Sequence, residues 1–381
     1  MKNKASVVVI GGGVVGCSIA YNLASQGISD VVLVEKSFLA SGSTGRCGAG
    51  VRQQWGTKMN CLLAQKSMEI LENMNDILHT KRDIELKQKG YLLLAYTEKE
   101  MNQFKKNVEL QNSLGIASKI ITPSQAREIV PYLNTEKLLG GAFYEKDGHA
   151  NPFLVTNAYA QAAISLGAEV NTYTDVVSIK RNGSKIEGVQ TNKGFISTDT
   201  VIDAAGGYSA EIGKMAGVDI PVYPQRHQIL VTDPVDEVLG PMVMSFSYNI
   251  YCQQSPQGSF IMGYGDPNEP KDYNINSSWR FLEEMAEKAV WLLPPLKNLR
   301  VVRQWSGLYT MTEDRQPLIC KADEAENFYM ACGFSGHGFM IAPMVGKLIS
   351  EMVLGKKLSI DIELNYKRFE KGELLFEPSV V

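Results

Sequence analysis

Three glycines near the start of the chain have the spacing of a phosphate-binding turn. Residues 11–16 read GGGVVG, which matches the pattern G-x-G-x-x-G. Gly11 allows a tight turn, Gly13 lets the backbone approach a pyrophosphate, and Gly16 lets a helix pack closely on a strand. Unpaired N–H groups at the N-terminus of the following helix can bind the phosphates. This spacing predicts a dinucleotide site.

An acidic residue supports that interpretation. Glu35 follows the glycines at roughly the 20-residue spacing of an acid that accepts hydrogen bonds from the adenosine ribose. Its charge disfavours a 2′-phosphate, so FAD or NAD is favoured over NADP. The alternative, a glycine-rich hairpin, does not explain Glu35.

Two further stretches could touch a cofactor. Residues 333–338 read GFSGHG and precede an apolar helix expected from about 339 to 354. A helix N-terminus there would stabilise negative charge, such as the charge that a reduced flavin carries over N1 and the C2 carbonyl. The glycines could instead only cap a core helix. The loop 41–52 combines small residues, hydroxyls and two arginines, and it could wrap a ligand or be a flexible surface loop.

The elements that position these residues predict an α/β fold of mixed α+β character. A strand at 7–10, the glycine turn, a helix and a strand at 31–34 follow one another, and further buried strands are expected near 201–203 and 328–332. We expect residues 60–78 to form one helix. We expect residues 168–206 to return to the nucleotide domain. The strand-rich remainder predicts a second domain with an antiparallel sheet.

The composition is that of an ordinary globular chain of two domains. The chain has 381 residues, 44% of them hydrophobic and 21% charged, with a net charge of −3. This balance argues against nucleic-acid binding and against an anionic membrane surface. No apolar run reaches the roughly 18 residues of a membrane span. Six cysteines without C-x-x-C and four scattered histidines argue against a metal site and favour free thiols in a cytoplasmic protein.

Four segments occur in an order that resembles a known superfamily. They are the glycine turn, Gly42-Ser43-Thr44, residues 309–314 (YTMTED) and residues 333–339 (GFSGHGF). Together they resemble the D-amino-acid oxidase/sarcosine oxidase (DAO) superfamily of FAD enzymes over essentially the whole chain. Residues 42–54 and 368–374 are similar to the β subunit of heteromeric dye-linked L-proline dehydrogenases, relatives of the sarcosine oxidase β subunit.

The resemblance implies a discontinuous Rossmann-like FAD-binding domain and a substrate domain. The FAD-binding domain would comprise residues 1–78, 150–220 and 320–381, and the substrate domain residues 79–149 and 221–319. FAD would extend from the glycine turn, past the backbone of Val176 at the adenine, to the loop before the last long helix. The expected cofactor residues are Gly11, Gly13, Val14, Val15, Gly16, Glu35, Lys36, Ser43, Thr44, Arg46, Cys47, Gly48, Val176, Ala205, Gly206, Gly333, Gly336, His337, Gly338, Phe339 and Met340.

The resemblance also implies catalytic residues. Arg52 matches an arginine that pairs with the substrate carboxylate, a task that suits a bidentate guanidinium. A surface or structural ion pair is its alternative role. Tyr251 and Tyr309 are expected as hydroxyl donors, although each could equally be a core tyrosine, and His337 is expected beside the flavin.

Several positions depart from monomeric sarcosine oxidases. Gly307 stands where a cysteine anchors FAD, so we expect FAD to bind non-covalently. Ile261 stands where a lysine promotes the reaction with oxygen, so we expect poor oxygen reactivity. Met340 replaces a second carboxylate-binding lysine. Pro152 replaces the histidine that holds FMN covalently in heteromeric relatives, so any FMN shared with a partner subunit would be held without a covalent link.

These features predict FAD-dependent oxidation of a secondary or small amino acid, such as proline, hydroxyproline or a sarcosine-like amino acid. Hydride would pass from the carbon next to nitrogen to flavin N5, and electrons would then reach a partner flavin, quinone or dye rather than oxygen. The alternatives are a glycine or D-amino-acid oxidase that uses oxygen, and a non-catalytic FAD-binding subunit of a heteromeric complex. An NAD-dependent dehydrogenase would not explain residues 333–340.

Overall fold

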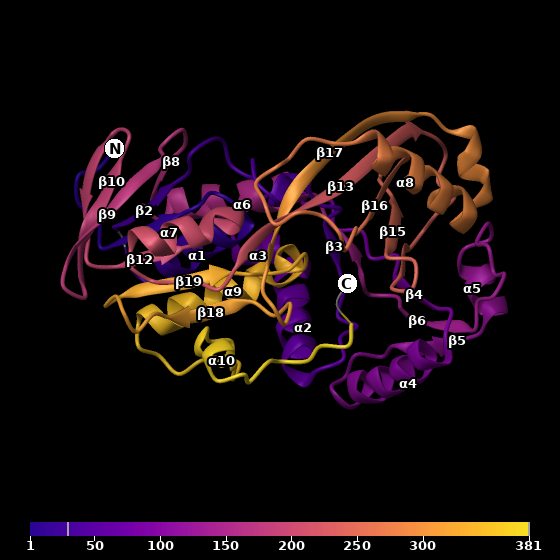
Figure 1. The fold of residues 1–381 in the computed structure, drawn as a ribbon. Helices are drawn as coiled ribbons and strands as arrows, with labels where there is room; N and C mark the ends of the chain where they lie inside the picture. The colour runs from indigo at the N-terminus through magenta and orange to yellow at the C-terminus, as the bar shows by residue number, and fades with distance from the viewer. Residues whose placement is uncertain (29, 380–381) are drawn as a thin grey trace.

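A computed structural model describes residues 1–28 and 30–379 and contains two large β-sheets, one at each end of the molecule (Figure 1). The first has the strand order β18-β19-β12-β1-β2-β8, and all of its pairings are parallel except that of β18 with β19. Such sheets are buried on both faces, which explains the unbroken apolar runs of β1 and β2. The strands are β1 (Val7–Ile10), β2 (Val31–Val34), β8 (Glu169–Asn171), β12 (Val201–Asp203), β18 (Leu318–Lys321) and β19 (Phe328–Cys332).

Different layers cover the two faces of this sheet. Val7 and Val9 pack in one cluster with residues of the helices α1 (Val14–Ser25), α6 (Pro152–Ser165) and α9 (Gly338–Val353). Val8 and Ile10 belong to a second cluster, because successive strand side chains point to opposite faces. That cluster includes residues of α7 (Ser209–Met215) and of a three-stranded antiparallel sheet, β9 (Val176–Asn182), β10 (Lys185–Thr191) and β11 (Gly194–Ser197).

The second large sheet is antiparallel except for the parallel pairing of β14 with β4. The helices α5 (Pro123–Ile129) and α8 (Trp279–Leu292) pack on one of its faces, and α4 (Glu98–Ser113) packs on the other. Its order is β17-β13-β16-β15-β14-β4-β6-β5. The strands are β4 (Tyr91–Ala95), β5 (Lys119–Ile121), β6 (Gly140–Tyr144), β13 (Tyr223–Pro234), β14 (Met242–Ser245), β15 (Ile250–Gln254), β16 (Ser259–Tyr264) and β17 (Val301–Met311).

The predicted mixed α/β class, with one largely parallel and one antiparallel sheet, is confirmed. The first sheet draws on three separated parts of the chain and the second on two. The exact domain boundaries stay a prediction. A short pairing of β3 (Gly50–Val51) with β7 (Gly148–His149) lies between the two sheets (Figure 1).

One expectation about an individual element was wrong in detail. The helix expected over residues 60–78 is divided into α2 (Lys58–Glu72) and α3 (Met74–Ile77), because the backbone of Asn73 leaves the helical conformation. Of residues 168–206, only β8 and β12 join the six-stranded sheet. The intervening strands form the separate antiparallel sheet, since the turn at Asn182-Gly183 pairs β9 with β10 instead.

Among the residues that the structure describes, no helix is both long and apolar enough to cross a membrane. All six cysteines are free thiols, and five of them are buried.

Candidate active site

A long cavity opens at the carboxyl ends of the parallel strands β1, β2 and β12, where open α/β sheets bind their ligands. Most of the residues expected to hold a cofactor line it. They are Gly11, Gly13, Val14, Val15, Glu35, Lys36, Ser43, Thr44, Arg46, Cys47, Val176, Ala205, Gly206, Gly336, Gly338 and Phe339.

The glycine turn has the geometry that a bound pyrophosphate needs. Gly11 has a φ of +113°, and a Cβ there would lie 2.3 Å from the carbonyl oxygen of Ala204. A Cβ on Gly16 would lie 1.9 Å from the carbonyl oxygen of Gly11, so Gly16 packs α1 against the turn and does not line the cavity. Gly13 precedes α1 and has no side chain to cap it, and the N–H of Val14 donates to the Thr44 hydroxyl (3.2 Å), so this hydroxyl and the first turn of α1 meet at the cavity. The turn therefore fits a dinucleotide phosphate.

Glu35 also has a structural role that the sequence did not reveal. Its carboxylate accepts hydrogen bonds from the backbone N–H groups of Gly12 (2.7 Å) and Ser37 (2.8 Å) and from the Ser41 hydroxyl (3.3 Å). It thus ties the glycine turn to the end of β2 while lining the cavity. Its contact with a ribose stays a prediction.

The N-terminus of α9 lies where the cofactor cavity meets a second pocket. Gly338 and Phe339 line the cofactor cavity, and Phe339 also lines the second pocket. The helix has 16 residues and no side-chain cap, so its first N–H groups favour negative charge at this junction. Gly333 lines neither cavity, because it packs against Thr312 and Val222.

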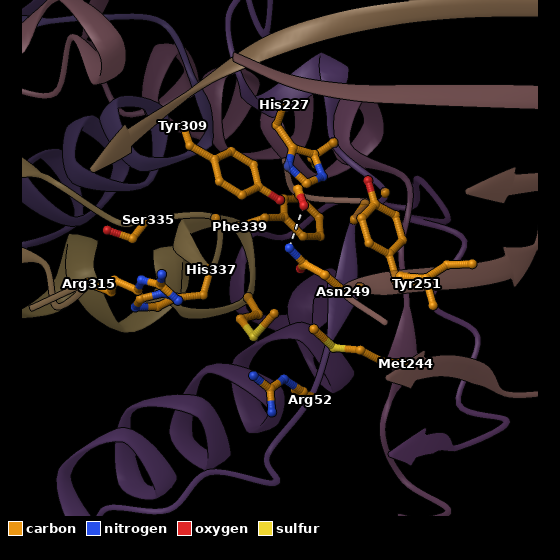
Figure 2. Close-up of a pocket in the computed structure, with 18 of the residues that line it drawn as sticks. Arg52, His227, Met244, Asn249, Tyr251, Tyr309, Arg315, Ser335, His337 and Phe339 are labelled. Carbon is orange, nitrogen blue, oxygen red and sulfur yellow. Dashed lines mark hydrogen bonds between the residues drawn. The ribbon is translucent and has the colours of Figure 1, made fainter. Parts of the chain in front are cut away.

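The second pocket is built from side chains of widely separated elements (Figure 2). Arg52 follows β3, His227 lies on β13, Tyr251 on β15 and Tyr309 on β17, and His337 precedes α9. Gly48, His337 and Met340, which were expected at the cofactor, line this pocket and not the cofactor cavity. The pocket shares five lining residues with the cofactor cavity: Cys47, Tyr309, Ser335, Gly336 and Phe339.

Arg52 presents a buried cation to this pocket. Its side chain is only 4% exposed, and its guanidinium lies 4.1 Å from the centre of the Trp55 ring. It donates hydrogen bonds to the carbonyl oxygens of Gln54 (2.9 Å) and Ser379. None of the acidic side chains that the structure describes forms an ion pair with it. These contacts argue against the alternative of a surface or structural ion pair.

Burial lowers the pKa of the Arg52 guanidinium, and the nearby Tyr91, Glu377 and Asp147 side chains oppose that shift. An arginine nevertheless stays protonated in a protein. Two of its five N–H donors are used by backbone carbonyls, so a carboxylate entering the pocket can take others.

Tyr309, His227 and Tyr251 lie side by side above the pocket (Figure 2). The His227 ring stacks on Tyr309, with centroids 4.3 Å apart and planes 5° apart, and its centroid lies 5.8 Å from that of Tyr251. Burial lowers the pKa of His227 to about 4, so its imidazole is neutral at pH 7. Burial raises the pKa of both tyrosines, which keeps their hydroxyls protonated.

His227 was missed by the sequence analysis. Its Nε2 is buried and has no hydrogen-bond partner in the described part of the chain. The strand pairing places His227 opposite Gly307 and Gln225 opposite Tyr309. The period-2 alternation along β13 could have indicated that Gln225 and His227 share a face, but not that this face meets a pocket.

His337 is a second neutral imidazole. Burial, helped by the Arg52 charge, lowers its pKa to about 3. It meets Trp55 edge-on at 5.1 Å between centroids, and neither ring nitrogen finds a partner among residues 1–28 and 30–379. The pocket therefore offers hydrogen-bonding groups without a strong base. Trp55, Asn249 and Arg315 also line it and were not anticipated.

A metal site finds no support in the described ranges, where no group of three or more His, Cys, Asp or Glu side chains is arranged to hold an ion.

The family model for FAD-dependent oxidoreductases, DAO, matches residues 6–352. The chain belongs to this family. The resemblance read from the glycine turn and the 333–339 segment is therefore confirmed, and this DAO-family chain is an FAD-dependent oxidoreductase. The residues around the long cavity fit FAD in kind, since glycines, a helix N-terminus and hydroxyls surround its phosphate end.

Relatives of known activity match nearly the whole DAO-family chain. It is 28% identical to sarcosine oxidase subunit beta of Rhodobacter capsulatus, over 99% of this chain and 91% of that protein. It is 30% identical to mitochondrial dimethylglycine dehydrogenase of Rattus norvegicus, but spans only 45% of that protein's length. The solved structure of L-proline dehydrogenase from P. horikoshii superposes with a TM-score of 0.93 at 39% identity, covering 98% of this chain and 100% of that one.

Proposed function

We propose that this chain oxidises a small or secondary amino acid, of the proline, hydroxyproline or sarcosine class, and passes the electrons to an acceptor other than oxygen. The observation that carries the proposal is the buried Arg52 guanidinium, which faces a pocket joined to the FAD cavity and has no described acidic partner. A carboxylate is the group that satisfies such a cation.

The pocket can bind an amino acid by both of its ends. Arg52 would hold the carboxylate, and the aromatic rings of Trp55 and Tyr91 would exclude water from that contact. The neutral imidazole of His227 and the hydroxyls of Tyr309 and Tyr251 would face the amine end. When bound, FAD supplies the acceptor for the hydride that leaves the carbon next to nitrogen. The protein would contribute positioning rather than a strong base.

The proposal of a dehydrogenase rather than an oxidase has two supports. One is the similarity to the L-proline dehydrogenase structure, and the other is one position that departs from monomeric sarcosine oxidases. The L-proline dehydrogenase structure aligns with nearly the whole chain, and Ile261 replaces a lysine that the resemblance associates with oxygen reactivity. This second support comes from the resemblance alone, because Ile261 on β16 lines neither cavity.

Non-covalent FAD and a partner subunit are also proposals. Gly307 provides no thiol to bond a flavin, and a Cβ there would lie 3.0 Å from the Arg46 side chain. A relative named as a subunit suggests a heteromeric complex, in which FMN shared with the partner could carry electrons onward.

The test is anaerobic reduction of the purified flavoprotein by a panel of L-proline, hydroxyproline, sarcosine, glycine and D-alanine. We expect a secondary amino acid to bleach the flavin, acid to release intact FAD, and turnover with a dye to exceed turnover with oxygen greatly. Oxygen turnover equal to dye turnover would instead identify an oxidase. Flavin that no amine reduces would indicate a non-catalytic subunit, and cofactor mass analysis would reveal any FMN.

Arg52 is tested by Arg52→Met, with the exposed Arg82→Met as the matched control. We expect kcat/KM for the amino acid to fall at least about a hundredfold, a loss of about 3 kcal/mol, because the carboxylate would lose its cation in a buried site. Oxidation of pyrrolidine, which lacks a carboxylate, should not change. An unchanged KM for the amino acid would refute the assignment of Arg52.

A further inference from the structure

The C-terminal segment 373–379 contacts the turn that carries Arg52. Figure 1 shows the yellow C-terminal segment that precedes residue 380 between the two large sheets, close to β3. Two polar residues of this segment are buried, Glu377 at 4% exposure and Ser379 at 0%. They lie beside the turn that carries Arg52, so the tail is part of the surroundings of the proposed carboxylate site.

The carboxylate of Glu377 organises the start of α2. One oxygen accepts hydrogen bonds from the backbone N–H groups of Gly56 (2.8 Å) and Ser379 (3.0 Å). The other accepts from the Thr57 hydroxyl (2.7 Å) and the Asn60 amide (2.9 Å). Four donors satisfy this buried charge, which accounts for its stability without an ion pair.

Ser379 connects the Glu377 cluster to Arg52 and to helix α4. Its carbonyl oxygen accepts a hydrogen bond from Nη2 of Arg52, and its hydroxyl accepts one from Asn107 on α4 (2.9 Å). Because Glu377 binds the Ser379 N–H, the carboxylate determines where the carbonyl that holds Arg52 lies.

A second buried carboxylate, that of Asp147, binds the same turn. Asp147 accepts hydrogen bonds from the backbone N–H of Gln53 (2.8 Å) and the side-chain amide of Gln54 (3.0 Å). Neither carboxylate forms an ion pair with Arg52 in the described chain. Both favour the charged guanidinium through space, yet they leave its remaining N–H donors for a ligand.

We propose that Glu377 is a positioning residue for Arg52. By binding the Arg52 turn at Gly56 and orienting the Ser379 carbonyl, it holds the guanidinium toward the pocket and stabilises its charge without occupying its donors. The inference rests on the proposed function, in which Arg52 binds the substrate carboxylate.

The test compares Glu377→Gln with Glu373→Gln, an exposed residue of the same tail. Glutamine keeps the size of the side chain but removes the charge and faces the Asn60 amide with a second donor. We expect KM for L-proline or sarcosine, and Kd for propionate measured from the flavin absorbance, to rise about tenfold in Glu377→Gln. kcat should change little, oxidation of pyrrolidine should not change, and FAD content should match that of Glu373→Gln. The melting temperature should fall below that of Glu373→Gln, because a buried donor loses its acceptor.

Asn107→Ala provides a second measurement if Glu377→Gln does not fold. It leaves the carboxylate in place and removes the bond to the Ser379 hydroxyl together with one that Asn107 accepts from Gln103 within α4 (2.7 Å), so we expect about a threefold rise in the propionate Kd. If wild-type constants persist in Glu377→Gln while Arg52→Met weakens carboxylate binding, Glu377 has no positioning role and the proposed function stands. Wild-type constants in Asn107→Ala would show that the position of Ser379 does not control Arg52, which removes the route by which Glu377 was proposed to act. If Arg52→Met itself changes nothing, the proposed function fails.

Discussion

The cofactor cavity and the second pocket share lining residues but are built from different parts of the chain. We call the second pocket the substrate pocket, after the function proposed for it. Glycines, helix N-termini and backbone N–H groups form the phosphate end of the cofactor cavity, much of it within residues 11–16. The substrate pocket consists of side chains that project from β13, β15, β17 and the loops before α2 and α9.

The two sites therefore depend on the local sequence to different degrees. A backbone site needs the absence of side chains at a few neighbouring positions, and glycine spacing records that need directly. A side-chain site needs several groups to converge, and these groups come from elements whose pairing is non-local. We therefore expect substitutions in the first region to affect cofactor retention and substitutions in the second to affect kinetics.

The largest effect is expected from Gly16→Ala. Its new Cβ would lie 1.9 Å from the Gly11 carbonyl oxygen, so α1 must move away from the turn. We expect loss of FAD from the purified protein and a loss of about 3 kcal/mol of stability. Gly42→Ala is the control, since Gly42 lines the cofactor cavity but its Cβ would meet nothing within 4 Å. Flavin content and thermal unfolding are measured for both variants. Full FAD occupancy in Gly16→Ala would contradict the expectation that substitutions at the glycine turn affect cofactor retention.

A smaller effect is expected from His227→Asn in the substrate pocket. Loss of the stack on Tyr309 should lower kcat/KM about tenfold without loss of FAD. Because the folded pKa of His227 is lowered to about 4, the imidazole stays neutral as pH rises from 6 to 10. The rise of kcat/KM over that range should therefore follow deprotonation of the substrate amine in both proteins.

The pH profiles of wild type, His227→Asn and the exposed His79→Asn provide the check. An inflection near pH 6.5 that is present in wild type and absent only from His227→Asn would show that His227 titrates near its ordinary value. That outcome would contradict a neutral imidazole in the pocket.

The smallest effect concerns a buried carboxylate behind the cofactor cavity. Burial raises the pKa of Asp203, at the end of β12, to about 7. The folded state therefore binds more protons than the unfolded state between about pH 4 and 7, and stability falls as pH rises through that window. In Asp203→Asn, the loss of folding stability over this pH window should be smaller by on the order of 1 kcal/mol.

Urea unfolding at pH 5 and pH 8 measures this difference, with the exposed Asp219→Asn as the control. Part of the slope should remain in Asp203→Asn, because burial also raises the pKa of Asp147 to about 7. An unchanged slope in Asp203→Asn would show that Asp203 is ionised in the folded protein at much lower pH.

Much of the fold could be predicted because its signals are local. The apolar runs of β1, β2 and β19, with glycines after β1 and β19 and Glu35 after β2, indicated a buried parallel sheet with a dinucleotide site. The break at Asn73 could not be predicted, since the apolar pattern continues through it. The site was predicted in part: Arg52, Tyr251, Tyr309 and His337 do line one pocket, but their functional roles stay predictions.

The sequence alone predicted a dinucleotide site at the first glycine turn, because the glycine spacing is local and Gly16 packs on Gly11, a near neighbour along the chain. The stacking of His227 between two tyrosines and the hydrogen bond from Gly56 in the Arg52 turn to Glu377 became visible only in the folded chain. Those arrangements join residues up to several hundred positions apart. Burial then sets their charge states, and burial at a given residue is a property of the assembled fold rather than of its neighbours along the chain.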